Sequence, residues 1–183
     1  ASGPLSDTLA ARISLRHEGG GDWQKSYTRD AGLGQRAFTQ GRVQLAFRPV
    51  DTVRLNLMVN AYQDHGDTQA PQFTAPFQQS AGFFDPRLPT YPVAPEDNRA
   101  ADWGTSFPLK KDNWQVQAAL RGEIDVSDDI TLTSISAYTR FKEAYGQESD
   151  GTTLRLTDVF LEGDIKSFSQ ELRLAGSLMG DGS

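Results

Sequence analysis

The sequence predicts an all-β protein, an antiparallel up-and-down meander of about six long strands. Apolar and polar side chains alternate with a period of two in about six runs, and the connections between these runs are alternately short and long. Charged residues within the runs mostly fall on the side opposite the apolar residues, so each run has an apolar and a polar face. Together these patterns predict one sheet with its tight turns at one end and its long loops at the other.

The runs cover about residues 9–18, 38–48, 52–63, 113–126, 130–142 and 165–176. Each has the length and alternation of a β-strand with one side against an apolar phase. The stretch 167–176 is typical, since Leu172 and Leu174 alternate with Glu171 and Arg173. The predicted apolar face of the other clearly alternating runs comprises Ala11, Ile13, Leu15, Val43, Leu45, Phe47, Val53, Leu55, Leu57, Val59, Ala61, Trp114, Val116, Ala118, Leu120, Ile124 and Val126.

The run at 130–142 is ambiguous because both of its faces carry apolar residues. Ile130 and Leu132 share a face with Arg140, whereas Ile135 and Phe141 share the opposite face with threonines. We expect Ile135 and Phe141 to lie on the apolar face.

The connections alternate strictly in length. Short turns rich in Pro, Ser or Asp are predicted at 4–7, 49–52 and 127–129, and a further turn at 180–182. Long segments lie between them, at about 19–37, 64–112 and 144–164. Long structureless loops are unusual in a compact soluble domain, whereas outer-membrane barrels have short periplasmic turns and long extracellular loops. The pattern therefore predicts an open segment of a transmembrane β-barrel.

The charges agree with this assignment. A lysine or arginine facing lipid at the midplane costs roughly 2–4 kcal/mol, and a slip of one residue would turn the arginines of several runs outward together. Phe47, Trp114 and Phe141 lie near run ends on the expected lipid side, where an aromatic girdle would form.

Composition excludes several other classes. The formal net charge of −6 argues against nucleic acid as a partner, because phosphate binding requires a basic face. The absence of cysteine excludes a disulfide scaffold and Cys-ligated zinc. No apolar run is long enough for a membrane helix, and the chain opens on Ala1 with neither an initiator Met nor a signal peptide, so we expect a piece of a longer protein.

Catalytic, cofactor and metal motifs are also missing. His17 and His65 are the only histidines, and we expect surface or strand-end positions for both. Glu143, Glu148 and Asp150 lack EF-hand spacing and are predicted to be solvated loop carboxylates. Since phosphate-loop, GxSxG and dinucleotide fingerprints are absent too, we expect no enzyme, cofactor or metal site.

Two groups of residues are candidates for binding. The long segment 64–112 is rich in aromatic residues, which either pack an ordered loop cap or form a mouth for a bulky ligand. The ligand-binding candidates are Phe73, Phe77, Phe83, Phe84, Tyr91 and Trp103. A second group of charged residues would face the lumen of the barrel, where they would either pair with each other and with a plug or guide an anionic ligand. These lumen-facing candidates are Arg12, Arg16, Arg48, Arg54, Arg121, Glu123, Glu171 and Arg173.

Several pieces of the sequence, in this order, resemble the early barrel strands of TonB-dependent outer-membrane receptors. They are GPLSDTL at 3–9, GRVQL at 41–45, residues 49–57, DTQA at 67–70 and above all SQELRL at 169–174. The resemblance implies that residues 1–183 are a partial barrel domain, roughly a quarter of a barrel of about 22 strands. The N-terminal plug and the C-terminal strands of that family are missing from this sequence.

The resemblance also implies a function and partners. Such receptors lie in the outer membrane of Gram-negative bacteria and import iron-siderophores, cobalamin or glycans with energy delivered by TonB. The expected partners are outer-membrane lipid, an extracellular small-molecule ligand such as a metal chelate, and a plug domain and TonB contacted through other parts of the protein.

Two alternatives remain open at the level of sequence. A secreted soluble β-sandwich could bind carbohydrate through Trp103, Tyr91 and Phe84, and it would bury Leu57 and Leu120 between two sheets. A small complete barrel of about eight strands, with outer-membrane enzymes as one precedent, would require two further strands within 64–112.

Overall fold

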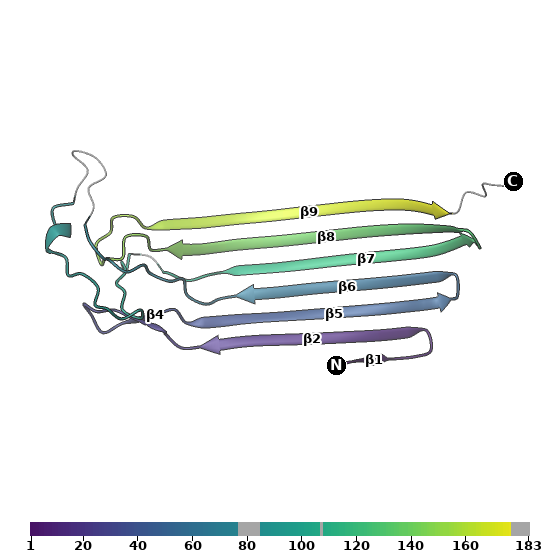
Figure 1. The fold of residues 1–183 in the computed structure, drawn as a ribbon, viewed down its shortest axis with the longest axis horizontal. Helices are drawn as coiled ribbons and strands as arrows, with labels where there is room; N and C mark the ends of the chain where they lie inside the picture. Colours follow the sequence, from purple (N-terminus) through teal and green to yellow (C-terminus); the bar gives the residue numbers. More distant parts are fainter. Residues whose placement is uncertain (77–84, 107, 177–183) are drawn as a thin grey trace, which may run out of the picture.

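The structure is a computed structural model that describes residues 1–76, 85–106 and 108–176, and these residues form one large sheet with packed loops at one end (Figure 1). The sheet is antiparallel throughout, in the order β1-β2-β5-β6-β7-β8-β9. Its strands are β1 (Ser2–Pro4), β2 (Leu9–Gly20), β5 (Arg36–Val50), β6 (Val53–Asp64), β7 (Asn113–Ser127), β8 (Ile130–Gln147) and β9 (Val159–Gly176). The loops contain a small sheet of β3 (Gln24–Lys25) and β4 (Gly32–Leu33) and a 3-10 turn, η1 (Leu88–Thr90).

The predicted fold class is confirmed, as the six long strands all form and pair in chain order. The three predicted tight turns join β1 to β2, β5 to β6 and β7 to β8, at the end of the sheet opposite the long loops (Figure 1). The extent of the strands differs from prediction. The short edge strand β1 was not predicted, and β8 and β9 are 18 residues each because their pairing continues to Gln147 and Val159. The third long loop is therefore 148–158.

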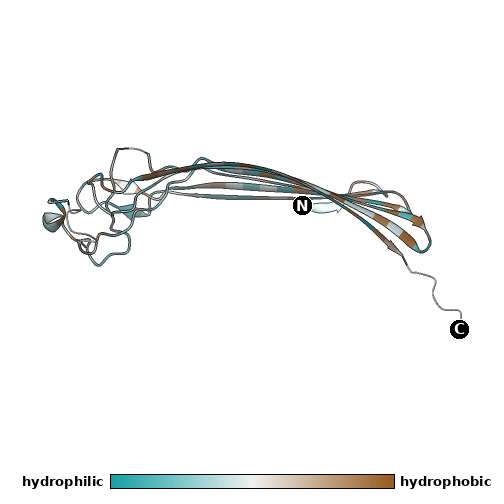
Figure 2. Cartoon of the chain, turned by 90° about the horizontal axis from the view of Figure 1, so that it is seen from above, coloured by the Kyte–Doolittle hydropathy of each residue, from teal (hydrophilic) through white to brown (hydrophobic). Residues whose placement is uncertain are grey.

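The register assigns each residue to one of two faces, because directly paired residues of an antiparallel ladder share a face. The middle of the apolar face is a row formed by Ile13, Val43, Val59, Ala118, Tyr138 and Phe168. Large side chains on this face are open to the surroundings, with Leu15 82%, Leu172 70% and Phe168 69% exposed. Edge-on, the long strands form a single twisted layer, with no second sheet over the apolar face (Figure 2).

The prediction for the run at 130–142 is wrong. Ile135 pairs with Arg121 and Glu171, so it lies on the polar face, and Phe141 shares that face three rows further along. Leu132 and Tyr138 therefore belong to the apolar face. The phase of β8 is set by its neighbours β7 and β9, whose alternation is unambiguous, and a one-residue slip would reverse their faces relative to β8.

The buried core lies in the loops and not in the sheet. Leu33, Ala70, Ala101, Trp103 and Leu109 form a cluster of buried residues, which we call the cap core, and the loops 21–35, 65–112 and 148–158 that surround it are called the loop cap. Leu120 is 44% exposed, so the sandwich alternative, with a core between two sheets, is not what the described residues form. The described part of 65–112 adds only isolated bridges and η1, which gives no support to a closed small barrel.

Among the described residues, no helix has the length and apolarity that crossing a membrane requires.

Candidate functional site

Seven of the eight lumen-facing candidates share the polar face of the sheet. Through the paired rows, the register places together Arg12, Arg16, Arg54, Arg121, Glu123, Glu171 and Arg173. Arg48 lies within the register irregularity between Phe47 and Val50 and donates its N–H to the Thr8 carbonyl at 2.8 Å.

Near the tight turns, the charges of the polar face pair with one another. Arg54 donates two hydrogen bonds to the Asp125 carboxylate, at 2.8 and 2.7 Å, and a third to Glu123 at 3.2 Å. Arg121 also bonds Glu123, and Arg173 donates to its strand neighbour Glu171 at 2.7 Å. Bidentate arginine–carboxylate pairs of this kind fix side-chain geometry. At this end of the polar face, these arginines and carboxylates are therefore already engaged in ion pairs with one another.

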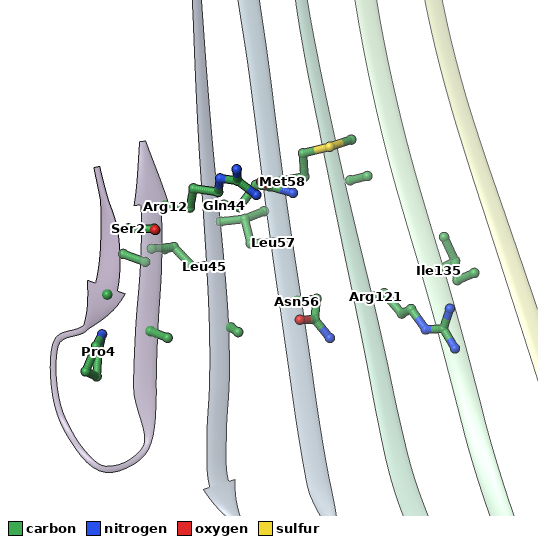
Figure 3. Close-up of a pocket in the computed structure, with 15 residues that line it drawn as sticks. Ser2, Pro4, Arg12, Gln44, Leu45, Asn56, Leu57, Met58, Arg121 and Ile135 are labelled. Atoms are coloured by element: carbon green, nitrogen blue, oxygen red, sulfur yellow. The ribbon is translucent and has the colours of Figure 1, made fainter. Parts of the chain in front are cut away.

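A shallow hollow of about 610 Å³ occupies the middle of the polar face. Alanines at positions 10, 46 and 119 line its floor. Because these side chains are short, they leave open space above the sheet. In Figure 3, Arg12 and Arg121 lie toward opposite sides of this hollow, with Met58 and Asn56 between them. Arg12 makes no ion pair within the described part of the chain, so its charge is available to a group that fills the hollow.

A second pocket, of about 520 Å³, lies where the polar face meets the loop cap. The acidic residues Glu18, Asp64 and Asp67 line it, together with the cations Arg36 and Lys111. The Lys111 ammonium lies 3.2 Å from the Asp64 carboxylate. The aromatic residues of this pocket are Trp23, Phe38 and Tyr145.

None of these aromatic residues was a sequence candidate. Phe38 stacks on Tyr62, with ring centroids 5.7 Å apart, and the Arg16 guanidinium lies 6.0 Å from the Phe38 ring centre. Both rings belong to the polar face, so continuing its alternation to the loop ends of β5 and β6 would have found them. A mixed charged and aromatic pocket suits a polar ligand with planar groups.

The aromatic candidates of the long loop mainly hold the loop cap together. Phe73 and Trp103 are 7% and 6% exposed, and Tyr91 is half-buried. Phe73 meets Tyr91 edge to face at a centroid distance of 5.6 Å, while Trp103 lies in the cap core under the Arg29 guanidinium, 4.9 Å from its ring centre. The remaining candidates Phe77, Phe83 and Phe84 lie outside the described residues. A ligand-binding role for any of the six stays a prediction.

Asp102 joins parts of the cap through a fully buried carboxylate. It accepts hydrogen bonds from the hydroxyls of Ser26, Thr28 and Tyr91, the last two at 2.8 Å. Burial, with smaller contributions that include this carboxylate, raises the pKa of Tyr27 and of Tyr91. Both phenols are therefore neutral donors across the physiological pH range.

Three carboxylates meet at the base of the third loop. Glu148, Asp150 and Asp158 each offer one oxygen, and these oxygens lie within 4.8 Å of one another. Glu148 is 2% exposed, so the prediction that it is solvated is wrong. Burial raises the pKa of Glu148 to about 6, and the negative charges of Asp150 and Asp158 raise it in the same direction. Hydrogen bonds from backbone N–H groups act the other way, since they favour the charged form. Asp158 was not a sequence candidate.

The two histidines are exposed and lie apart. His17 Nδ1 is 2.9 Å from the Thr39 hydroxyl, and His65 Nδ1 is 3.5 Å from an oxygen of Asp112. Neither is part of the one group of three or more metal-ligand side chains found in the described residues.

The architecture defines a class: an open antiparallel meander with one exposed apolar face, one polar face and its long loops at a single end is a segment of β-barrel wall. No protein-family model and no curated protein matches the chain. Among solved structures, the chain is similar to the closed form of the ferric-catecholate import receptor Fiu from K12 E. coli, with a TM-score of 0.54 at 16% identity. The match covers 93% of this chain and 24% of that receptor. It supports the predicted receptor-barrel fold.

Proposed function

We propose that this chain is part of the barrel of a TonB-dependent outer-membrane receptor that binds a metal chelate, such as an iron-siderophore, outside the cell and imports it. Its role is binding and passage, without catalysis. The observation that carries the proposal is the one-sided sheet, in which most of the exposed large apolar residues lie on one face while arginines and carboxylates of the opposite face pair with one another. Such a sheet suits lipid on one side and a wet lumen on the other.

The dimensions of the apolar face support a membrane span. On β6 it runs from Val53 to Ala61, and on β7 from Ile124 to Val116, which pair with those residues. Eight residue steps cover about 27 Å along a strand, or about 20 Å along the membrane normal at a tilt of about 40°. This is close to the apolar band of roughly 25 Å in outer-membrane barrels. Trp114 lies one row beyond Val116 on the same face, at the expected interface.

The polar face supports the transport half of the proposal. Its central hollow, between Arg12 and Arg121, has room for side chains of a plug domain. The pocket at the junction with the loop cap is then the first enclosed space that a ligand from outside meets. The likeness to a ferric-catecholate receptor favours a metal chelate over cobalamin or a glycan as the cargo.

The topology can be tested with single cysteines, because residues 1–183 contain none. We expect Glu96→Cys, in the loop cap, to react with a membrane-impermeant maleimide on intact cells. Asp51→Cys, in the tight turn between β5 and β6, should react only after the outer membrane is permeabilised. Equal labelling of both positions on intact cells contradicts the barrel orientation.

The cargo can be tested by uptake. Cells that carry the natural protein should accumulate radiolabelled iron from a ferric catecholate, and deletion of either the receptor or TonB should abolish this uptake. Uptake of labelled cobalamin or an oligosaccharide instead would reassign the cargo and leave the receptor class intact. Uptake that continues without TonB refutes the proposed energy coupling.

A further inference from the structure

The third loop closes on itself so that its two ends bring acidic side chains together. Glu148 directly follows β8 and Asp158 directly precedes β9, and the last pair of the ladder, Gln147 with Val159, sets them side by side. Asp150 completes the group. The three oxygens lie within 4.8 Å of one another, close enough for one ion to hold them after small side-chain movements, since Ca²⁺ binds carboxylate oxygens at about 2.3–2.6 Å.

The second observation is an unpartnered oxygen at this point. The Asp158 side chain is 7% exposed, and its Oδ1 is buried without a hydrogen-bond partner, although Oδ2 accepts from the Ser106 hydroxyl at 2.8 Å. A Cβ placed on Gly104 would lie 3.6 Å from this Oδ1 and 3.7 Å from Glu148 Oε2, so both oxygens face the same space beside Gly104. A buried carboxylate oxygen with no donor is costly unless a cation meets it.

Among the described residues, one protein cation forms an ion pair with the cluster. Arg155 Nε lies 3.9 Å from Asp158 Oδ2, but the Arg155 side chain is 75% exposed, so this pair offsets little of the negative charge. The hydrogen bonds that the cluster does accept, such as those to Glu148 Oε1 from the N–H groups of Ser149 and Asp150, orient the carboxylates without supplying a full charge. Close like charges that are partly buried repel strongly, and a divalent cation would remove that repulsion.

The geometry points to a Ca²⁺ site formed by Glu148, Asp150 and Asp158, which ties the third loop to the segment around Gly104 and Ser106. We propose Ca²⁺ because the ligands are carboxylates without histidine or cysteine, which disfavours zinc and other softer metals. The irregular loop also suits the flexible coordination of Ca²⁺ better than the strict octahedron of Mg²⁺. The Gly104 N–H already donates to Glu148 Oε2 at 2.9 Å, so the ion would reinforce an existing link between two loops.

The test uses the natural protein in detergent micelles, first stripped with a chelator and then titrated with Ca²⁺ alone. We expect saturable binding below about 1 mM, the weak end of extracellular calcium sites, and a rise in the melting temperature with Ca²⁺. Tb³⁺, a luminescent substitute for Ca²⁺, should be sensitised by Trp103, which adjoins Gly104, and displaced by Ca²⁺. Equal stabilisation by Ca²⁺ and Mg²⁺ would indicate charge screening alone and would overturn the site.

Matched variants give the proposal a distinct signature. Asp158→Asn and Glu148→Gln should each weaken Ca²⁺ binding at least about tenfold, whereas Glu96→Gln, an exposed acid elsewhere in the cap, should leave it unchanged. Asp158→Asn relieves repulsion and keeps an acceptor for the Ser106 hydroxyl, so in chelator it should melt no lower than the natural protein, and only Ca²⁺ should reverse that order. Unchanged Ca²⁺ affinity in both variants refutes the assignment, whatever the outcome of the uptake experiments.

Discussion

Replacing Leu57 with arginine would place a charge at the middle of the apolar face. Leu57 is four residue steps from Val53 and four from Ala61, so it lies about 10 Å from either edge of the apolar band along the membrane normal. At this depth a lipid-facing arginine costs roughly 2–4 kcal/mol. The adjacent Met58 is on the polar face, in a row with Gln44 and Ala119, and arginine there should cost less than about 1 kcal/mol.

The free energy of unfolding of the two variants can be measured with the natural protein folded into lipid vesicles and titrated with urea. Tryptophan fluorescence and the gel mobility of the folded form give two independent readouts of the transition. We expect Leu57→Arg to shift the midpoint downward by far more than Met58→Arg, because the two positions share a depth and differ only in face. Equal losses, or a larger loss at Met58, would refute the assignment of faces.

Three further substitutions probe the loop cap and the polar wall. Tyr91→Phe should cost the cap about 1–2 kcal/mol, since Asp102 loses one of its buried donors, and hydrogen exchange of the cap amides reports it. Gly151→Ala, made as a separate variant, should lower the stability of the cap by about 1–2 kcal/mol in the same assay, because φ is +72° there and a Cβ would lie 2.8 Å from the Pro71 carbonyl oxygen. Arg54→Met should lower the urea midpoint in vesicles by leaving Asp125 without its bidentate partner, and an unchanged midpoint would contradict a structural role for the pair.

Most of the sheet was predictable because strand alternation and turn composition are local signals. The phase of β8 was not, since its own apolar residues are divided between its faces, and only pairing with neighbours such as Arg121 and Glu171 decides it. The strand β1 spans three residues, too few for a period to be recognised. The length of β8 and β9 likewise depends on their mutual pairing and not on either sequence alone.

The sequence likewise predicted one part of the candidate site and not the other. The polar-face charges followed from alternation, so sequence sufficed for residues such as Arg12 and Glu171. The acidic cluster did not follow, because Asp158 comes from the far end of a loop and meets Glu148 only once the hairpin register is known. The same holds for the packing of Trp103, whose partners in the cap core come from two long loops.

The three long loops are joined strongly enough to act as one unit. Gln24, in the first loop, donates to and accepts from the backbone of Ala70 in the second, at 2.8 and 3.0 Å. The second and third loops are joined where the Thr153 N–H donates to the Tyr91 hydroxyl at 2.8 Å. Closing one loop over a ligand while the others stay in place would break these bonds, of which the Gln24–Ala70 pair is buried, each at a net cost of about 0.5–1.5 kcal/mol.

The β8–β9 hairpin extends further toward the loop cap than the other strands do. Beyond the pair of Lys142 with Asp164, the β8–β9 hairpin continues to the pair of Gln147 with Val159, another five residue steps, or about 17 Å. The third loop therefore stands beyond the ends of the other strands on a two-stranded arm, while the first two loops leave the sheet at the ends of β2, β5, β6 and β7. Residues of both parts, such as Asp67 and Tyr145, line the junction pocket. We predict that a ligand in that pocket would contact both the polar wall and the joined loops, and would therefore affect more than one loop of the cap.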